Sequence, residues 1–291
     1  MMKPLSHIYL QVNFQKEHAT DVAARVSQLL TAAGAKVYVD DTCRRYLPEL
    51  KAIFTHDIPA DADMILVVGG DGSILDIAPR AVERNLPLLG INLGRLGYLA
   101  EVAKDELQLL TRLMSGAYTV SERMTLTLAI VRGEEKLKLP GIAFNEVAIT
   151  HENNLGLCDL LLTDSDCNRI RYRGDGLVIA TPSGSTAYSF SCGGPVMHPD
   201  LAAICVTPIC PHSFFNRSMI LPSETEITVE CGGDPENKLY VSLDGRNTYL
   251  LHAGEKILVC RGDKRLRMIT FEKHGMMNTL RQKMQDAELK D

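Results

Sequence analysis

Apolar residues in the first part of the chain follow two spacings, one typical of buried strands and the other of amphipathic helices. Residues 63–68 (DMILVV) form a continuous apolar run, which suits a parallel strand buried on both faces. Val22, Val26 and Leu30 lie instead on one helical face. The predicted elements are, in order, strand 7–12, helix 18–33, strand 35–40, strand 63–68, helix 73–84 and strand 87–92. This alternation predicts a Rossmann-like, doubly wound parallel sheet over residues 1–117.

After residue 117 the pattern changes to short β-rich runs separated by turn residues. The predicted strands are 124–131, 143–150, 157–163, 177–181, 225–230, 239–243, 256–261 and 265–271. They predict a C-terminal all-β domain of the β-sandwich type over residues 118–272. Residues 273–291 are predicted to form a helical tail, whose thin apolar stripe favours docking on a core or a subunit contact.

Composition agrees with a folded two-domain protein. Of the 291 residues, 45% are hydrophobic and 23% are charged, which excludes disorder, collagen and coiled coil. The net charge of −5 comes from 31 Lys and Arg against 36 Asp and Glu. This balance disfavours nucleic acid and anionic membranes as partners.

The cysteines point to a reducing compartment. There are eight, with no C-x-x-C pair and no spacing that would gather four metal ligands. We therefore expect reduced, mostly buried thiols and a cytoplasmic location. The N-terminus lacks the apolar core of a signal peptide, and no span of 18 or more apolar residues exists, so we expect no membrane association.

A glycine-rich turn, Gly69-Gly70-Asp71-Gly72-Ser73, stands directly between a predicted buried strand and a predicted helix. In an open α/β sheet this position faces the ligand crevice, where glycines let backbone N–H groups approach phosphate. A carboxylate there repels phosphate unless Mg²⁺ intervenes or the carboxylate accepts a proton from a hydroxyl being phosphorylated. The alternative is a tight turn in which Asp71 caps the helix.

A second polar signal, Asn145-Glu146, interrupts an apolar β run. Adjacent residues of a strand point to opposite faces, so at least one of the two side chains meets a buried or ligand-filled region. An Asn amide can pair with an adenine edge, and a carboxylate can accept the hydroxyls of a ribose. A water-exposed pair at a strand end is the alternative.

Two further segments are rich in turn residues. Residues 181–195 combine glycine and small hydroxyl residues around Tyr188, a composition that offers backbone groups and a stacking ring to a purine. A loop without a ligand has the same composition. Asp244-Gly245-Arg246 follows a predicted strand, where Asp-Gly is a common hairpin turn.

Together these motifs resemble the NAD kinase family. GGDG at 69–72, GINLGRLGYL at 90–99 and NE at 145–146 stand in the family's order and approximate spacing. They are followed by GDGLVIATPSGSTAYSFSCGGP at 174–195, Pro211-His212 and DGR at 244–246. GGDG alone also occurs in diacylglycerol kinases, sphingosine kinases and phosphofructokinases, whereas TPSGSTAYS combined with NE is more specific.

The resemblance implies transfer of the γ-phosphoryl group of ATP, or in some members of inorganic polyphosphate, to the 2′-hydroxyl of the adenosine ribose of NAD, giving NADP. It implies Mg²⁺ or another divalent cation bridged through the ATP phosphates, with no protein ligand assigned, and a homodimer or homotetramer. Acceptance of NADH stays open.

The family's functional positions map onto this chain residue by residue. Asp71 matches the catalytic base, and Gly69, Gly70, Gly72 and Ser73 form the loop that phosphate approaches. Asn145 and Glu146, with Gly72, match the adenosine pocket. The remaining dinucleotide positions are Arg173 and Asp175 near the nicotinamide half, then Ser183, Thr186, Ala187, Tyr188, Ser189, Phe190, Ser191 and Arg246, and Gly156, where some relatives carry a contacting side chain.

Three other functions remain open from the residues alone. A lipid or sugar kinase of the GGDG group would need a different acceptor pocket. A non-catalytic module would bind NAD without consuming ATP. A nucleophilic hydrolase would use Ser185 or Cys192 with His198 or His212, although no G-x-S-x-G motif is present.

Overall fold

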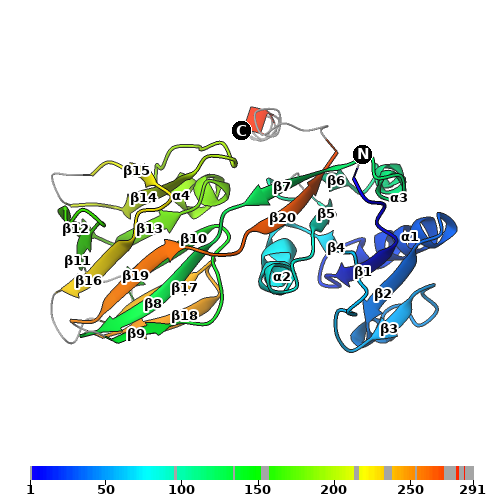
Figure 1. The fold of residues 1–291 in the computed structure, drawn as a ribbon, viewed down its shortest axis with the longest axis horizontal. Coiled ribbons are helices and arrows are strands. Elements are labelled where there is room, and N and C mark those ends of the chain that lie inside the picture. Colours follow the sequence, from blue (N-terminus) through cyan, green and yellow to red (C-terminus); the bar gives the residue numbers. More distant parts are fainter. Residues whose placement is uncertain are drawn as a thin grey trace. The chain divides into compact units, whose positions relative to one another are not determined.

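The computed structural model describes residues 2–94, 97–133, 135–151, 157–212, 216–232, 238–252 and 254–271, and residues 280, 281 and 285 (Figure 1). These residues form two compact units, one of residues 1–122 with 266–291 and the other of residues 123–265. Within the described ranges, no helix has both the length and the apolar composition needed to cross a membrane.

The first unit is built on an eight-stranded sheet with the order β3-β2-β1-β4-β5-β20-β7, and β6 pairs with β5. Strands β1 to β6 and β20 pair in parallel. The strands are β1 (His7–Val12), β2 (Lys36–Asp40), β3 (Ile53–Thr55), β4 (Met64–Gly69), β5 (Leu88–Asn92), β6 (Val102–Ala103), β7 (Thr119–Arg123) and β20 (Leu266–Thr270). The helices are α1 (Ala19–Ala32), α2 (Asp71–Glu83) and α3 (Thr111–Met114), with 3₁₀ turns at Asp41–Arg45 and Leu107–Leu110.

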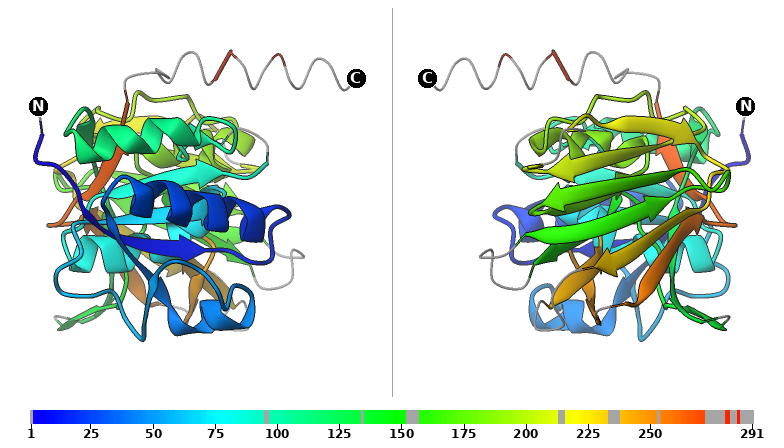
Figure 2. Two further views of the ribbon diagram at one scale, coloured as in Figure 1. Left: turned by 90° about the vertical axis from the view of Figure 1, so that its right-hand side faces the viewer. Right: turned by 90° about the vertical axis from the view of Figure 1, so that its left-hand side faces the viewer.

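Helices cover both faces of this sheet. Leu66 of β4 packs with Val26 and Leu30 of α1 in one core, and the left-hand view of Figure 2 shows α1 lying across the strands. Ile65, the next residue along β4, points to the other face and is fully buried there, where α2 contacts β4 and β5. Burial on both faces explains the continuous apolar run of β4 and confirms the doubly wound sheet.

The last strand of the first unit comes from the end of the chain. Met268 of β20 pairs in parallel with Leu88 of β5, so residues 266–270 complete the N-terminal sheet. The sequence-based boundaries at 117/118 and 272/273 therefore differ from the observed units, because a short apolar run alone does not show which sheet it joins. Most of the predicted tail, 273–291, lies outside the described residues.

The second unit is a sandwich of two six-stranded antiparallel sheets, β15-β14-β13-β10-β17-β18 and β12-β11-β16-β19-β8-β9. The right-hand view of Figure 2 looks onto its strands. They are β8 (Leu126–Arg132), β9 (Glu135–Lys138), β10 (Glu146–His151), β11 (Cys158–Thr163), β12 (Arg169–Gly174), β13 (Gly176–Ala180), β14 (Ala203–Ile209), β15 (Met219–Pro222), β16 (Ile227–Gly232), β17 (Leu239–Leu243), β18 (Asn247–Leu251) and β19 (Lys256–Arg261), with a 3₁₀ turn at Ser183–Thr186 and the short helix α4 (Tyr188–Ser191).

The sandwich core takes alternate residues from both sheets. Val147 and Ile149 of β10 pack in one cluster with Leu160 of β11 and Val229 of β16. Alternation of buried and partly exposed positions along β8, β11 and β16 matches a strand with one buried face. The predicted fold class, an α/β unit followed by an all-β sandwich, is confirmed.

A partly buried carboxylate, that of Asp63, fixes the start of the first sheet. Asp63 Oδ2 accepts hydrogen bonds from the backbone N–H groups of Ser6 and His7, both at 3.0 Å, and Lys3 Nζ lies 3.3 Å from its Oδ1. Burial alone would raise the pKa of Asp63. The two amides and the Lys3 ammonium outweigh that effect, so the pKa falls below its ordinary value.

We expect Asp63→Asn to lower the free energy of unfolding by about 1–3 kcal/mol at pH 7, because charge-assisted hydrogen bonds to two amides are lost. Since the pKa is depressed in the folded state, this stabilisation is present above pH ~3.9 and disappears as the pH falls through the folded pKa. Urea unfolding at pH 7 and pH 3 measures both effects, with exposed Asp105→Asn as the control. An unchanged unfolding midpoint at pH 7 would contradict this role.

Candidate active site

The glycine-rich turn joins β4 to α2 at the carboxyl edge of the parallel sheet. Gly70 is the residue before the helix, and Asp71 is its first residue, so Asp71 does not cap the helix. Ser73 donates its backbone N–H to Gly70 O at 2.9 Å and accepts a hydrogen bond on Oγ from Asn13 Nδ2 at 2.8 Å. A Cβ on Gly69 would overlap the Ser73 side chain, which explains glycine at this position.

The Asp71 carboxylate is held by the loop that follows β5. Oδ2 accepts the Tyr98 backbone N–H at 2.8 Å, and Oδ1 accepts that of Leu99 at 3.2 Å. A Cβ on Gly97 would overlap this carboxylate. The GINLGRLGYL segment therefore positions Asp71, and glycine at 97 makes the close approach possible. Arg95 and Leu96 of this segment lie outside the described residues.

Asn145 and Glu146 are both buried, with 9% and 7% of their surfaces exposed. The alternative of a water-exposed pair is therefore wrong. The backbone of this segment pairs with the strand end at Thr181, whose N–H donates to Asn145 O at 2.8 Å and whose Oγ1 donates to Phe144 O at 2.6 Å. A Cβ on Gly184 would overlap Asn145 O, so the glycine-rich loop packs directly on this segment.

Glu146 is poised to receive a hydrogen bond. Its Oε2 is buried and has no partner. Burial, and next the charge of Asp244, raise the pKa of Glu146 to about 7, against the opposing effect of the Tyr188 backbone amide. A buried carboxylate oxygen without a donor is costly, and a ligand hydroxyl would satisfy it.

The glycine- and serine-rich segment folds into compact turns rather than an open loop. Ser185 Oγ donates to Pro182 O at 2.6 Å and accepts the Met197 N–H at 2.9 Å, and Ser189 Oγ lies 2.9 Å from Thr207 Oγ1. These buried hydroxyls shape the segment internally. Ser183 is also buried, whereas Thr186 and Ala187 are half-buried and Tyr188, Phe190 and Ser191 are exposed.

Four further predicted residues lie outside this segment. Asp175, exposed between β12 and β13, contributes with Glu146 to a raised pKa of Tyr188, whose largest cause is burial. Arg173 is exposed on β12, and its carbonyl accepts the His212 N–H at 2.7 Å. Arg246 is exposed in the β17–β18 turn, and Gly156 lies outside the described residues.

Sequence reasoning missed the role of Asp244, which it read only as a turn residue. Its carboxylate accepts three backbone N–H groups, those of Phe144, Asn145 and Glu146. The Asp-Gly pair signalled the hairpin correctly, since Asp244 and Gly245 have φ of 52° and 67°. The contact with residues 144–146 is long-range, and a local pattern does not reveal it.

A hydrolytic mechanism finds no support in the geometry. The hydrogen bonds of Ser185 Oγ go to backbone groups of residues 182 and 197, and burial raises the pKa of the Cys192 thiol. His198 is exposed, and its Nδ1 accepts the Asp200 N–H at 3.3 Å. A thiolate or activated hydroxyl nucleophile is therefore disfavoured.

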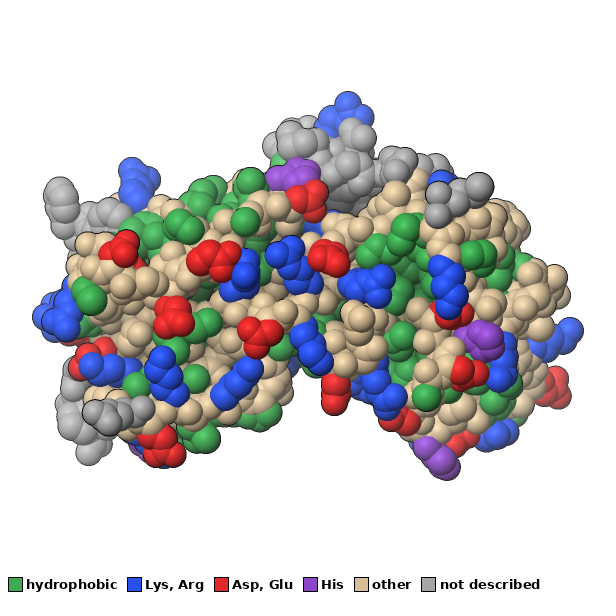
Figure 3. Space-filling view, in the orientation of Figure 1, with side chains coloured by type: hydrophobic (Ala, Val, Ile, Leu, Met, Phe, Trp, Pro, Cys, Tyr) green, Lys and Arg blue, Asp and Glu red, His purple; other side chains and the backbone are tan. Residues whose placement is uncertain are grey.

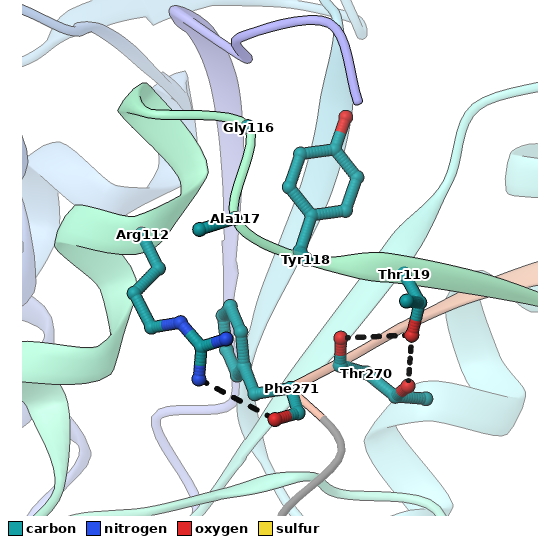
Figure 4. Close-up of a pocket in the computed structure, with 7 residues that line it drawn as sticks. All are labelled: Arg112, Gly116, Ala117, Tyr118, Thr119, Thr270 and Phe271. Atoms are coloured by element: carbon teal, nitrogen blue, oxygen red, sulfur yellow. Dashed lines mark hydrogen bonds between the residues drawn. The ribbon is translucent and has the colours of Figure 1, made fainter. Parts of the chain in front are cut away.

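A small pocket lies in the first unit, and none of the predicted site residues lines it. It has a volume of about 140 Å³ and is lined by Arg112, Gly116, Ala117, Tyr118, Thr119, Thr270 and Phe271 (Figure 4). Arg112 donates to Phe271 O at 3.3 Å, and the Thr119 and Thr270 hydroxyls are 2.8 Å apart. Its polar side chains thus bond mainly to one another or to backbone.

The strand order 3-2-1-4-5, with Asp71 at the carboxyl edge, places the first unit in the class of doubly wound α/β domains, many of which bind nucleotides. Residues 8–118 match the model of the ATP-NAD kinase N-terminal domain, and residues 144–271 match that of the ATP-NAD kinase C-terminal domain. The chain therefore belongs to the ATP-NAD kinase family.

Curated relatives agree over most of the chain. The NAD kinase of Geobacter sulfurreducens is 36% identical over 92% of this chain and 94% of its own length. That of Acetivibrio thermocellus is 34% identical over 90% of each. Among solved structures, an Archaeoglobus fulgidus NAD kinase in complex with ATP has a TM-score of 0.69 at 25% identity, covering 92% of this chain and 94% of the other.

A yeast NADH kinase complexed with NADH shares the fold, with a TM-score of 0.82 at 22% identity over 96% of this chain and 87% of the other.

We expect Glu146→Gln to stabilise the protein in a pH-dependent way. The folded pKa of about 7 lies above the ordinary 4.5, so burying this group costs stability as the pH rises from 4.5 through 7. Removing the charge should raise the free energy of unfolding by about 2–3 kcal/mol at pH 8.5 and leave it unchanged at pH 4. Urea unfolding measures this, with exposed Glu135→Gln as the control. Equal stabilities at pH 8.5 would contradict the assignment.

We expect Gly97→Ala to push the Asp71 carboxylate off the Tyr98 and Leu99 amides. Steady-state phosphorylation of NAD by ATP should fall about 10- to 100-fold in kcat, because a small displacement of a reacting group is costly. Gly94→Ala is the matched control, since a Cβ there meets open space in the same loop. Equal rates for the two variants would show that Asp71 does not need this support.

Proposed function

We propose that this protein is an NAD kinase, which transfers the γ-phosphoryl group of ATP to the 2′-hydroxyl of the adenosine ribose of NAD and releases NADP and ADP. The observation that carries the proposal is that both halves of the chain match the ATP-NAD kinase family while Asp71 stands at the carboxyl edge of the nucleotide-binding sheet.

Asp71 is proposed as the base that takes the 2′-hydroxyl proton. The Tyr98 and Leu99 amides occupy one lone pair on each carboxylate oxygen, and each oxygen keeps another for the substrate hydroxyl. A weak base suffices when proton transfer comes late in a loose phosphoryl-transfer transition state. Positioning and phosphate charge neutralisation would then supply most of the rate acceleration.

Asn145 and Glu146 are proposed to bind the adenosine portion of NAD. The unpartnered Oε2 of Glu146 supports this, because a ribose hydroxyl donates the hydrogen bond that the protein does not supply. The Asn145 amide offers both a donor and an acceptor to an adenine edge. Gly72, exposed in the first turn of α2, remains a proposed NAD contact from the family pattern.

The other residues proposed to contact the dinucleotide differ in how exposed they are. Tyr188, Phe190 and Ser191 are exposed and able to meet a ligand, with Asp175, Arg173 and Arg246 also at the surface. Ser189 is buried against Thr207, so it would shape the segment rather than contact NAD through its hydroxyl. Ser183, Thr186 and Ala187 would line the site through backbone groups, and Gly156 remains a proposal from the family pattern.

ATP is the proposed phosphoryl donor, accompanied by Mg²⁺ or another divalent cation. Among the described residues, no group of three or more His, Cys, Asp and Glu side chains forms a cation site, so no protein ligand is named. The proposed ion is bound through the ATP phosphates, where it would neutralise the charge of the transferring group. Gly69, Gly70, Gly72 and Ser73 would admit the phosphates to the start of α2.

A homodimer or homotetramer and a cytoplasmic location are further proposals. Leu201 and Ile220 of the second unit are large apolar residues with 50% and 55% of their surfaces exposed, which supports a protein interface there.

All eight cysteines are free thiols, as a reducing compartment requires. On the face shown in Figure 3, acidic and basic side chains are interspersed. Light scattering of the purified protein tests the oligomeric state.

We expect Asp71→Asn to lower kcat about 10²- to 10⁴-fold while NAD still binds, the usual contribution of a general base. A coupled assay of NADP formed from NAD with ATP and Mg²⁺ measures the rate, and calorimetry measures binding. Asp76→Asn, an exposed position on the same helix, is the control. A kcat within about threefold of the unsubstituted enzyme would remove Asp71 from this role.

An assay of ADP released from ATP distinguishes the competing kinases, because every one of them forms ADP whatever its acceptor. Substituting diacylglycerol or fructose 6-phosphate for NAD as acceptor should give no product. Phosphorylation of either substrate in preference to NAD would contradict the proposed function.

A further inference from the structure

Asp244 makes an unusual set of hydrogen bonds for a turn residue. Its Oδ2 accepts the Phe144 N–H at 2.8 Å, and its Oδ1 accepts the N–H groups of Asn145 at 2.8 Å and Glu146 at 3.0 Å. Its own N–H donates to Glu146 O at 3.0 Å. Four hydrogen bonds therefore connect this residue to a segment about a hundred positions earlier in the sequence.

These bonds continue a ladder that the strands leave incomplete. β10 and β17 pair from Val147 and Leu243 onward, and residues 144–146 lie just beyond that pairing. On the opposite side, Thr181 bonds the carbonyls of Phe144 and Asn145. Thr181 thus donates hydrogen bonds to the carbonyl groups of this segment, and the Asp244 carboxylate accepts hydrogen bonds from its N–H groups. The backbone that carries Asn145 and Glu146 is therefore fixed from both sides.

The turn itself does not require a carboxylate. Asp244 and Gly245 both have positive φ, and asparagine tolerates the left-handed region as well as aspartate does. An aspartate that uses both oxygens on another segment's amides has a function beyond the turn. Asp244 is half-buried, and burial raises the pKa of its carboxyl above the ordinary value, while the three amide donors oppose that shift.

Building on the proposed function, we propose that Asp244 is a positioning residue for NAD. Its carboxylate sets the backbone from which Asn145 and Glu146 reach the adenosine.

The charge has a measurable consequence. After burial, the charge of Asp244 is the next cause that raises the pKa of Glu146 to about 7. The other titratable groups that face Glu146 are Tyr188 of α4 and Cys192 just after it. Both are neutral near pH 7, because burial raises their pKa values. Asp244 is therefore the neighbouring charge that affects the pKa of Glu146.

The test is Asp244→Asn, with the dissociation constant of NAD measured by calorimetry between pH 5.5 and 8.5 and KM and kcat measured alongside. The asparagine keeps one acceptor oxygen, but its NH₂ group faces an N–H donor. We expect NAD to bind about 10- to 100-fold more weakly at pH 8, with kcat changed by less than about threefold.

The pH profile separates positioning from mere structural support. In the unsubstituted protein, NAD affinity should rise with pH through about 7, as Glu146 ionises. In Asp244→Asn the midpoint should move down by about one pH unit, because the like charge is gone. An unchanged affinity, or a weaker affinity with an unmoved midpoint, overturns the proposal.

Asp164→Asn is the matched control. Asp164 Oδ1 also accepts two backbone N–H groups, those of Asp166 at 3.0 Å and Asn168 at 2.9 Å, in the turn after β11. This substitution should leave both the NAD affinity and the pH midpoint unchanged.

Two further measurements keep the inference testable. If Asp244→Asn does not fold, the unsubstituted protein is compared with Glu146→Gln instead. The pH profile of NAD affinity should have a midpoint near pH 7 in the unsubstituted protein and none in Glu146→Gln. A flat profile in the unsubstituted protein overturns the inference. Because calorimetry reports binding without turnover, a protein that binds NAD with this profile but forms no NADP contradicts the proposed function and leaves the inference standing.

Discussion

The functional architecture depends on side-chain carboxylates that accept backbone N–H groups. Asp71 binds the amides of Tyr98 and Leu99, and Asp244 binds those of residues 144–146. In each case a charged acceptor joins two segments beyond the point where the pairing of their strands ends. Such bonds are short and strong, and they hold a loop or a strand end in one conformation without a large apolar contact. The reactive groups are thereby positioned on a rigid framework.

Glu146, in the same unit as Asp244, has a carboxylate oxygen that accepts no hydrogen bond. Its neighbour Asp244 is satisfied by three donors, whereas Glu146 Oε2 is buried without one, and its pKa rises to about 7. The unpaired Oε2 lowers the stability of the protein, and a ligand hydroxyl that donated to it would remove this loss. The proposed binding site therefore rests on an unsatisfied atom rather than on the size of a cavity. The one pocket described above lies instead among residues 112–119, 270 and 271, whose polar groups are largely occupied.

Sequence patterns predicted the elements with strong periodicity and missed those defined by partners. β1, β4 and β5, and helices α1 and α2, lie within a few residues of their predicted ranges, because each carries a buried apolar face. β14 and β15 were not predicted, since Pro208 and the short polar-flanked run at 219–222 obscure their pairing. β20 was predicted as a strand but assigned to the wrong unit, because register with β5 is a tertiary property.

In the candidate site, too, the sequence predicted some residues and missed others. The chemistry-bearing residues Asp71, Asn145 and Glu146 stand out locally, as polar groups in apolar surroundings. Their supports do not, because Gly97 and Asp244 act through contacts 26 and about 100 positions away in the chain. A glycine or a turn aspartate has many local uses, and only the folded chain shows which one applies.

A crystal structure with NAD bound tests the central claim most directly. The account predicts the 2′-oxygen of the adenosine ribose within about 2.6–3.2 Å of an Asp71 carboxylate oxygen, with the adenosine held by Asn145 and Glu146. A well-ordered dinucleotide whose 2′-oxygen lies more than a water's width from Asp71 would contradict it.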